Sequence, residues 1–139
     1  MAKNRIKKPK PKNTKHIEFK EEHPDYDDYK PIFSFCHMKY GKEYCVSRCT
    51  IKSKSSLVST ILQLSQLKWK KILSSPKETF GKENIPLKQF KATFNNYAVI
   101  SPDVNVLMVF RFSKSERMAG IRLKNVYEIL AVGKDLYEH

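Results

Sequence analysis

The residues best suited to binding a charged substrate lie near the C-terminal end of the chain. Arg111, Arg117 and Arg122 occur within short runs of β-strand character, and Tyr137 and His139 stand at the very end. A guanidinium group is always charged and offers a planar fork that matches phosphate oxygens. Imidazole accepts or donates a proton near neutral pH. A solvated strand face and a frayed chain end would give the same residues without any function.

The chain is strongly basic, and the charge is unevenly distributed. Its 139 residues include 27 Lys and Arg against 14 Asp and Glu, a formal charge of +13. Residues 1–15 carry seven basic residues and no acid, residues 16–30 carry six acids against two lysines, and residues 31–139 hold 18 basic and 8 acidic residues. A basic body attracts polyanions at long range, so nucleic acid is the expected partner. A lysine-rich surface without any partner is the alternative.

Several lysines of the body are candidates for nucleic-acid contacts. Three lie on the exposed side of a predicted helix, and three lie in or beside predicted turns of the C-terminal third; they are Lys68, Lys70, Lys71, Lys114, Lys124 and Lys134. Contacts of this kind weaken as salt rises, because counterions are released on binding. For the first three, the solvated side of a helix is the alternative.

The first 30 residues are expected to lie outside the folded domain. Residues 1–15 alternate Lys and Pro without apolar periodicity, which predicts a disordered basic arm. Residues 16–30 are acidic and rich in Tyr, which predicts a connector that lies against the basic body. Because the chain shows neither a run of about 18 to 20 apolar residues nor a secretory signal, we expect cytoplasmic localisation and no membrane contact.

The cysteines Cys36, Cys45 and Cys49 are odd in number and fall within one short segment. This argues against a disulfide framework and agrees with a reducing compartment. A zinc site that adds His37 is the alternative, but the spacing lacks paired CxxC knuckles and strand alternation turns His37 away. We expect small buried cysteines and no metal. Since no Walker, GxGxxG or GxSxG motif is present, neither a cofactor nor a small-molecule ligand is expected.

Residues 31–139 are predicted to form a single α+β domain around one core. Two β-rich runs, residues 32–40 and 43–50, are joined by Gly41-Lys42 and predict a β-hairpin. Apolar residues spaced three and four apart over residues 54–73 predict one long amphipathic helix. Ser53 or Ser55 would cap that helix, and Pro76 lies just beyond its end.

The C-terminal third is predicted to be an antiparallel β-meander. Its strands are expected at residues 104–112, 117–123 and 126–132, with a turn at Lys124-Asn125. Residues 77–103 contain two prolines, an Asn pair and scattered aromatic residues, which predicts mostly loop with one short helix or strand.

A helix followed by a meander whose last strand reads YEILAVGKDLYEH resembles the C-terminal half of the RelE/ParE-type toxins, over residues 54–139. In those toxins a strand of the form ILAVGHR is followed by a short segment that ends in Tyr or His. The segment SQLKWKKILSSPKETFGKENI, followed by VNVLMVFRF, is also similar to small uncharacterised proteins of phages and mobile elements.

The toxin resemblance implies a RelE-like fold, a toxin–antitoxin or phage-defence role with an acidic antitoxin as partner, and cleavage of RNA, often mRNA on the ribosome. The 2′-hydroxyl attacks the adjacent phosphodiester, and the enzyme supplies a base, an acid and cations without a metal. Carried onto this sequence, the resemblance implies that Arg111, Arg117 and Arg122 bind the phosphate, Arg111 foremost. It implies that Tyr137 and His139 transfer protons.

The sequence departs from the toxin pattern at Gly133, which is followed by Lys134 and Asp135 where the family has His-Arg. A noncatalytic phage or mobile-element protein is therefore the alternative, either a nucleic-acid-binding regulator or an inhibitor of a host nucleoprotein. Aromatic residues would then stack on bases, with Tyr97, Phe110 and Phe112 as candidates. A purely structural protein of a phage or mobile element is the third possibility.

Overall fold

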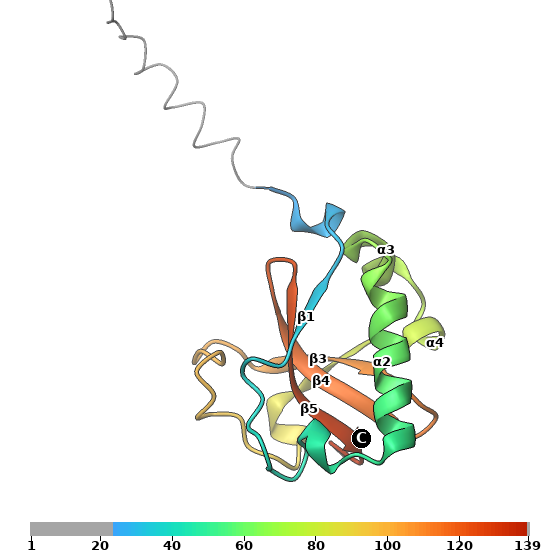
Figure 1. Ribbon diagram of the computed structural model, residues 1–139. Helices are drawn as coiled ribbons and strands as arrows, with labels where there is room; N and C mark the ends of the chain where they lie inside the picture. The colour runs from blue at the N-terminus through green and yellow to red at the C-terminus, as the bar shows by residue number, and fades with distance from the viewer. Residues whose placement is uncertain (1–23, 139) are drawn as a thin grey trace, which may run out of the picture.

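The computed structural model describes residues 24–138. The predicted disordered arm, residues 16–23 of the predicted connector and His139 lie outside this range. The described chain is α+β: a five-stranded mixed sheet has helices on one face (Figure 1). Its other face is covered by a long, mostly irregular segment, residues 87–105, which we call the connection. No helix among the described residues is long and apolar enough to cross a membrane.

The sheet has the strand order β1-β5-β4-β3-β2. Its strands are β1 (Ile32–Ser34), β2 (Glu83–Pro86), β3 (Val106–Arg111), β4 (Glu116–Leu123) and β5 (Val126–Lys134). The last three strands are the predicted antiparallel meander, which is confirmed, and Lys124 makes the β4–β5 turn with a φ of 61°. Residues 77–103 are confirmed as mostly irregular, apart from α4 (Lys77–Phe80), β2 and the 3₁₀ turn η4 (Leu87–Gln89).

The predicted long helix is wrong, because the chain forms two helices, α2 (Ile51–Ser65) and α3 (Trp69–Ser74). Lys68 between them is extended, with a ψ of 151°. The Trp69 N–H donates to the Tyr29 carbonyl oxygen at 2.9 Å instead of continuing the ladder of α2. This break lets the Trp69 side chain become fully buried. The helix also begins earlier than predicted, because Thr50 caps it by accepting a hydrogen bond from the Ser53 N–H at 3.1 Å.

The predicted β-hairpin over residues 32–50 is also wrong. β1 pairs in parallel with the start of β5, with Ile32 opposite Val126, and its Phe33 ring packs edge-on against Tyr127. Residues 43–50 form no strand; they contain the 3₁₀ turn η3 (Val46–Arg48). A single hydrogen bond, from the Val132 N–H to the Tyr44 carbonyl oxygen at 2.9 Å, ties this segment to β5. The start of the first predicted run, Ile32–Ser34, therefore pairs with β5 of the sheet and not with the second predicted run.

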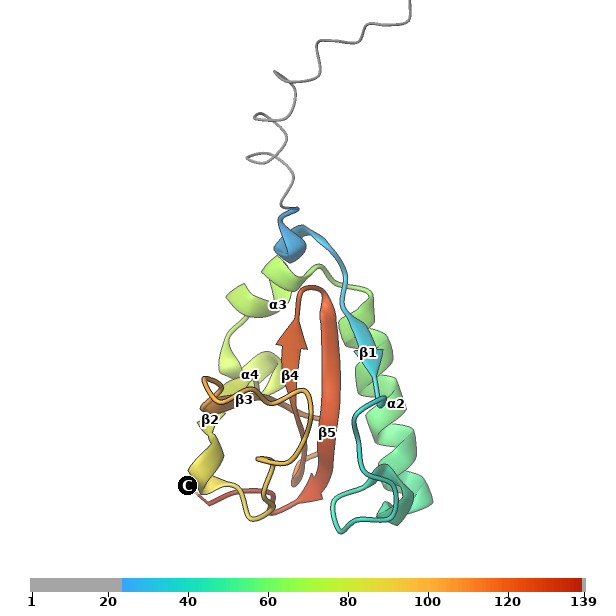
Figure 2. The ribbon, with the colours of Figure 1, turned by 90° about the vertical axis from the view of Figure 1, so that its left-hand side faces the viewer.

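Two apolar clusters cover the two faces of the sheet. The helical face joins α2 and α3 to the meander through ten buried residues: Leu57, Leu64, Trp69, Ile72, Phe110, Phe112, Met118, Tyr127, Ile129 and Val132. The opposite face packs under the connection through Ile85, Phe90, Phe94, Leu107, Val109, Ala119, Leu130, Ala131, Leu136 and Tyr137. The connection, yellow to orange, lies across the sheet from α2 in Figures 1 and 2. Side chains alternate between the two faces along β3 and β4, whereas the register shift in β5 places the consecutive residues Leu130 and Ala131 on the same face.

Tyr127 should make stability depend on alkaline pH. Its side chain is fully buried, its hydroxyl donates to the Met108 carbonyl oxygen at 2.6 Å, and burial raises its pKa well above the ordinary 10.0. The folded protein thus keeps a proton that the unfolded chain releases, so stability is full below about pH 10 and falls above it. Denaturant unfolding at pH 8 and pH 11 should show a larger loss for wild type than for Tyr127→Phe. Equal losses in the two proteins would contradict this assignment.

Candidate nucleic-acid site on the meander

Arg111 and Arg117 lie directly opposite each other on β3 and β4, and we call them the arginine pair. Each lies two residues from a member of the apolar cluster under the connection, Arg111 from Val109 and Arg117 from Ala119. Residues two apart on a strand point the same way, so both arginines lie on that face of the sheet. A glycine stands beside each of them: Arg117 pairs with Gly133 on β5, and a Cβ on Gly81, which follows α4, would lie only 2.6 Å from the Arg111 Cβ. The Arg111 side chain therefore packs closely against the Gly81 backbone, which leaves no room for a side chain there.

Backbone carbonyls hold both guanidinium groups. The Arg111 Nη2 donates to the Glu78 carbonyl oxygen at 2.7 Å. The Arg117 Nη1 donates to the Glu116 carbonyl at 3.2 Å and to the Ser113 carbonyl at 3.4 Å, at the β3–β4 turn. Within residues 24–138 neither arginine forms an ion pair. Two arginines therefore stand opposite each other on neighbouring strands, and neither has a carboxylate within ion-pair distance in the described chain.

Tyr137 lies beside the arginine pair and is held there by backbone contacts. It forms a β-bridge with Phe90, whose ring centroid lies 5.3 Å away, and the flanking Glu138 N–H donates to the Gln89 carbonyl at 3.0 Å. Burial, together with the nearby Glu83, raises the pKa of the Tyr137 hydroxyl, whereas the charge and hydrogen bond of Arg117 act to lower it. Like any ordinary tyrosine, this hydroxyl is protonated at neutral pH and can donate a proton or a hydrogen bond, and the net rise in its pKa makes it a weaker acid.

Glu83 and Lys77 complete this group, and sequence reasoning missed both. The Lys77 Nζ lies 3.2 Å from the Glu83 Oε2, and the Glu83 side chain is only 22% exposed. Both charges act on the Tyr137 hydroxyl. Because residues 77–103 were expected to be mostly loop, no strand alternation was available to place Glu83 on β2. We call Arg111, Arg117, Tyr137, Glu83 and Lys77 the arginine–tyrosine cluster.

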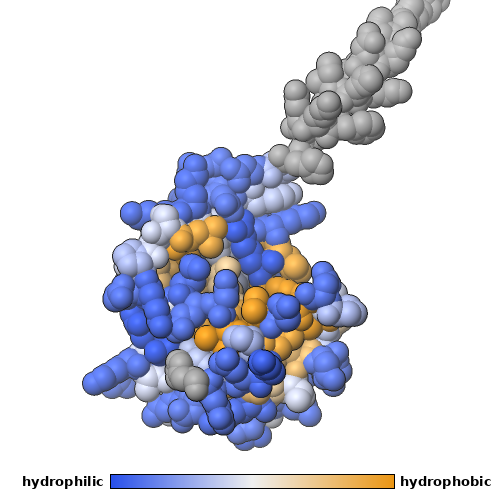
Figure 3. Space-filling view, turned by 180° about the vertical axis from the view of Figure 1, so that it is seen from behind, coloured by the Kyte–Doolittle hydropathy of each residue, from blue (hydrophilic) through white to orange (hydrophobic). Residues whose placement is uncertain are grey.

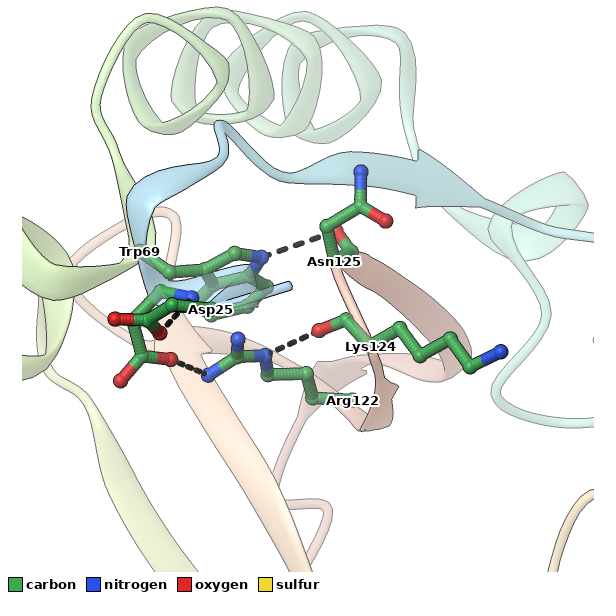
Figure 4. Close-up of polar contacts among 6 residues, drawn as sticks. Asp25, Trp69, Arg122, Lys124 and Asn125 are labelled. Atoms are coloured by element: carbon green, nitrogen blue, oxygen red, sulfur yellow. Dashed lines mark hydrogen bonds and ion pairs between the residues drawn. The ribbon is translucent and has the colours of Figure 1, made fainter. Parts of the chain in front are cut away.

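The structure does not bring Arg122 to this cluster. Arg122 is five residues from Arg117 on β4, so its side chain lies on the helical face, where its guanidinium stacks 4.4 Å from the Trp69 ring centroid. Its Nη1 pairs with the Asp27 carboxylate at 2.8 Å, and its Nε donates to the Lys124 carbonyl oxygen at 2.6 Å (Figure 4). Residues 24–30, the described part of the predicted connector, are therefore held against the sheet by the ion pair between Asp27 and Arg122.

Arg122→Ala should lower stability without lowering any activity of the arginine–tyrosine cluster. The cation–π contact and the hydrogen bond to Lys124 together predict a loss of about 1–2 kcal/mol, with little from the half-exposed ion pair. Denaturant unfolding measures this loss, and RNA binding and cleavage below the unfolding range should stay within about twofold of wild type. A stable Arg122→Ala protein that fails to act on RNA would place Arg122 in the site after all.

The candidate lysines fall into three places. Lys114 and Lys134 are exposed near the arginine pair, Lys114 in the β3–β4 turn and Lys134 at the end of β5. Lys124 is exposed in the opposite turn, next to Arg122. The remaining three lie at or in α3, where Lys68 and Lys71 are exposed and Lys70 pairs with Asp28. Only Lys114 and Lys134 therefore adjoin the cluster.

Base stacking on Phe110 and Phe112 is excluded, because both side chains are buried in the helical-face cluster. Tyr97 is half-buried, and the Lys39 Nζ lies 4.4 Å from its ring centroid. Among the cysteines, Cys45 is buried, Cys49 is half-buried and Cys36 is exposed, so the expectation that all three are buried is wrong. In the described part of the chain no group of three or more His, Cys, Asp or Glu side chains is arranged to hold a metal ion.

No protein-family model, curated protein or solved structure matches the chain. Function is therefore inferred from the residues and their geometry.

Proposed function

We propose that this protein is a metal-independent endoribonuclease toxin of the RelE/ParE type, which acts on RNA in the cytoplasm. The observation that carries the proposal is the arginine pair, two arginines opposite each other on β3 and β4 without an ion-pair partner in the described chain, beside the protonated hydroxyl of Tyr137. The arrangement of helices followed by an antiparallel meander, with the pair on its first two strands, supports the resemblance that the sequence suggests.

The cluster supplies the groups that RNA cleavage needs. The arginine pair stabilises the charge on the phosphorane that forms when the 2′-oxygen bonds to phosphorus. Glu83 accepts the proton of the 2′-hydroxyl, and Tyr137 donates its proton to the 5′-oxygen as the bond from phosphorus to that oxygen breaks. The products are a 2′,3′-cyclic phosphate and a 5′-hydroxyl end. His139 remains a prediction of the resemblance for one of these proton transfers.

The proposal includes an acidic antitoxin and the ribosome as partners. A strongly basic chain suits both an acidic protein and ribosomal RNA. Seen from behind, much of the surface is hydrophilic, with patches of hydrophobic surface among the polar side chains (Figure 3). An acidic segment that also carries apolar side chains would match such a mixed surface.

Incubation of the purified protein with single-stranded RNA in excess EDTA, with and without translating ribosomes, tests the proposal. The expected result is cleavage that leaves 2′,3′-cyclic phosphate and 5′-hydroxyl ends. A matched RNA with a 2′-O-methyl group at the cleavage position should stay intact, because it lacks the attacking hydroxyl. Intact RNA under both conditions, or equal cleavage of the methylated strand, would contradict the proposal.

A noncatalytic nucleic-acid-binding protein is the second candidate. The observation that favours it is that backbone carbonyls already hold both guanidinium groups of the arginine pair, as in a structural or binding role. For such a protein, charge reversals on exposed lysines should weaken RNA binding in graded steps, and no single substitution should abolish function.

A further inference from the structure

A second basic surface adjoins the arginine–tyrosine cluster on the other side of the β3–β4 turn. It is a groove of about 670 Å³ bounded by η3, the N-terminal turn of α2, residues 113–115 and the end of β5. We call it the basic groove. Its lining residues come from four segments that lie apart in the sequence, so no sequence motif predicts it.

Cations predominate along the basic groove. Four basic side chains line it: Arg48, Lys52, Lys114 and Lys134. The acids along it are Glu43 and Glu116. Glu116 is already engaged, because its Oε2 accepts a hydrogen bond from the Ser53 hydroxyl at 2.7 Å and its Oε1 accepts one from the Ser113 hydroxyl at 2.9 Å. This carboxylate therefore ties α2 to the β3–β4 turn and holds the two walls of the groove together.

The groove walls also offer donors to an anion. The Thr50 and Ser53 hydroxyls at the start of α2, a helix of 15 residues, already donate to the Ser53 hydroxyl and to Glu116, and the Ser56 hydroxyl on the next turn faces the groove as a donor. The N-terminal end of such a helix carries a partial positive charge. Added to the four cationic side chains, these groups suit a chain of phosphates better than a single compact ligand.

The groove and the arginine pair share the β3–β4 turn and Gly133, although they lie on opposite faces of the sheet. Arg117 donates to the carbonyls of Ser113 and Lys114, so the turn that forms one wall of the groove is also the support of Arg117. Gly133, which lines the groove, pairs with Arg117 across the sheet, and Lys134 pairs with Glu116. A strand whose phosphate lies on the arginine pair would therefore reach the groove by passing around the end of the sheet at Gly133 and the β3–β4 turn.

We infer that the basic groove binds the backbone of the single-stranded RNA that flanks the phosphate held by the arginine pair. This assignment rests on the proposed function for its choice of RNA, but groove binding is measured separately from cleavage. It predicts that affinity grows with the length of the RNA, because nucleotides beyond the reacting phosphate contribute contacts of their own.

The test compares two triple charge reversals of equal net change in the full chain. Lys52→Glu, Lys114→Glu and Lys134→Glu together alter the groove, whereas Lys30→Glu, Lys88→Glu and Lys91→Glu alter exposed lysines that do not line it. The probe is a fluorescein-labelled 12-nucleotide RNA with 2′-O-methyl groups throughout, followed by fluorescence anisotropy at several salt concentrations. Thermal unfolding confirms that both variants fold.

The groove variant should bind the probe at least about 30-fold more weakly at 0.1 M salt, and its log–log salt slope should be smaller by about 2, since each lost contact removes about 0.7. The control variant should bind the probe no more than about threefold more weakly than wild type. Equal losses in the two variants would overturn the groove assignment, as would tighter groove-dependent binding of duplex DNA than of RNA. Groove-dependent binding by a protein that cuts no RNA would overturn the nuclease proposal alone.

Discussion

Arg111→Ala and Arg117→Ala are each expected to lower kcat/KM for RNA cleavage by about 100- to 1000-fold, the usual effect of removing one preorganised group that stabilises transition-state charge. The reason is that the two arginines lie opposite each other on β3 and β4 and form no ion pair within the described chain. Each variant should lose only about 1 kcal/mol of stability, from one hydrogen bond to a backbone carbonyl for Arg111 and from the longer, shared hydrogen bonds of one Nη1 group for Arg117. Initial rates on a labelled RNA and denaturant unfolding measure the two effects.

Two controls make this prediction specific. Arg111→Lys keeps the charge but not the planar fork, so it should recover only part of the lost rate. Arg122→Ala, on the same sheet but on its other face, should destabilise the fold and leave the rate unchanged. Full activity in both alanine variants of the arginine pair would remove the pair from the site, whatever their stability.

Gly120→Ala should be among the most destabilising single substitutions in the fold. A Cβ at this position would lie 2.0 Å from the Glu128 carbonyl oxygen and 3.0 Å from its carbon, which are backbone atoms that cannot rotate away. The β4–β5 register shifts at this point, from Ala119 opposite Ala131 to Gly120 opposite Ile129. Both apolar clusters contain residues of β4 and β5. We therefore expect the free energy of unfolding to fall by about 3 kcal/mol or more, as measured by denaturant unfolding.

Gly41→Ala is the matched control for this prediction. Gly41, unlike Gly120, has a left-handed backbone with a φ of 80°, but a Cβ there would meet nothing within 4 Å. Its substitution should therefore cost only the backbone preference, about 1 kcal/mol. If the two variants lose the same stability, the close approach of the β4 and β5 backbones at Gly120 is not a packing constraint.

Local signals in the sequence were enough to predict the meander, whereas pairing between distant segments was not predictable. Each strand of the meander has its own apolar run, and short turns join them. β1 instead pairs with β5, which lies about 90 residues later in the chain, so its β-propensity was assigned to the wrong partner. The break before Trp69 escaped detection for the same reason, because it depends on a hydrogen bond to Tyr29.

Part of the candidate site could be predicted from the sequence. The resemblance selected Arg111, Arg117 and Tyr137, and the structure places them together. Strand alternation would have separated Arg122 from Arg117, since residues five apart on one strand point to opposite faces. Glu83, Lys77 and the basic groove depend on where the connection and α2 lie against the sheet. Such long-range placement has no local signal.

The most direct test of the central claim is induced expression in a bacterial host, with wild type beside Arg111→Ala and with total RNA mapped for new 5′ ends. We expect growth arrest and new 5′-hydroxyl ends only with the wild-type protein, and equal amounts of folded protein in both cultures. Healthy growth with intact RNA in the wild-type culture would contradict the nuclease proposal and favour the noncatalytic binding protein.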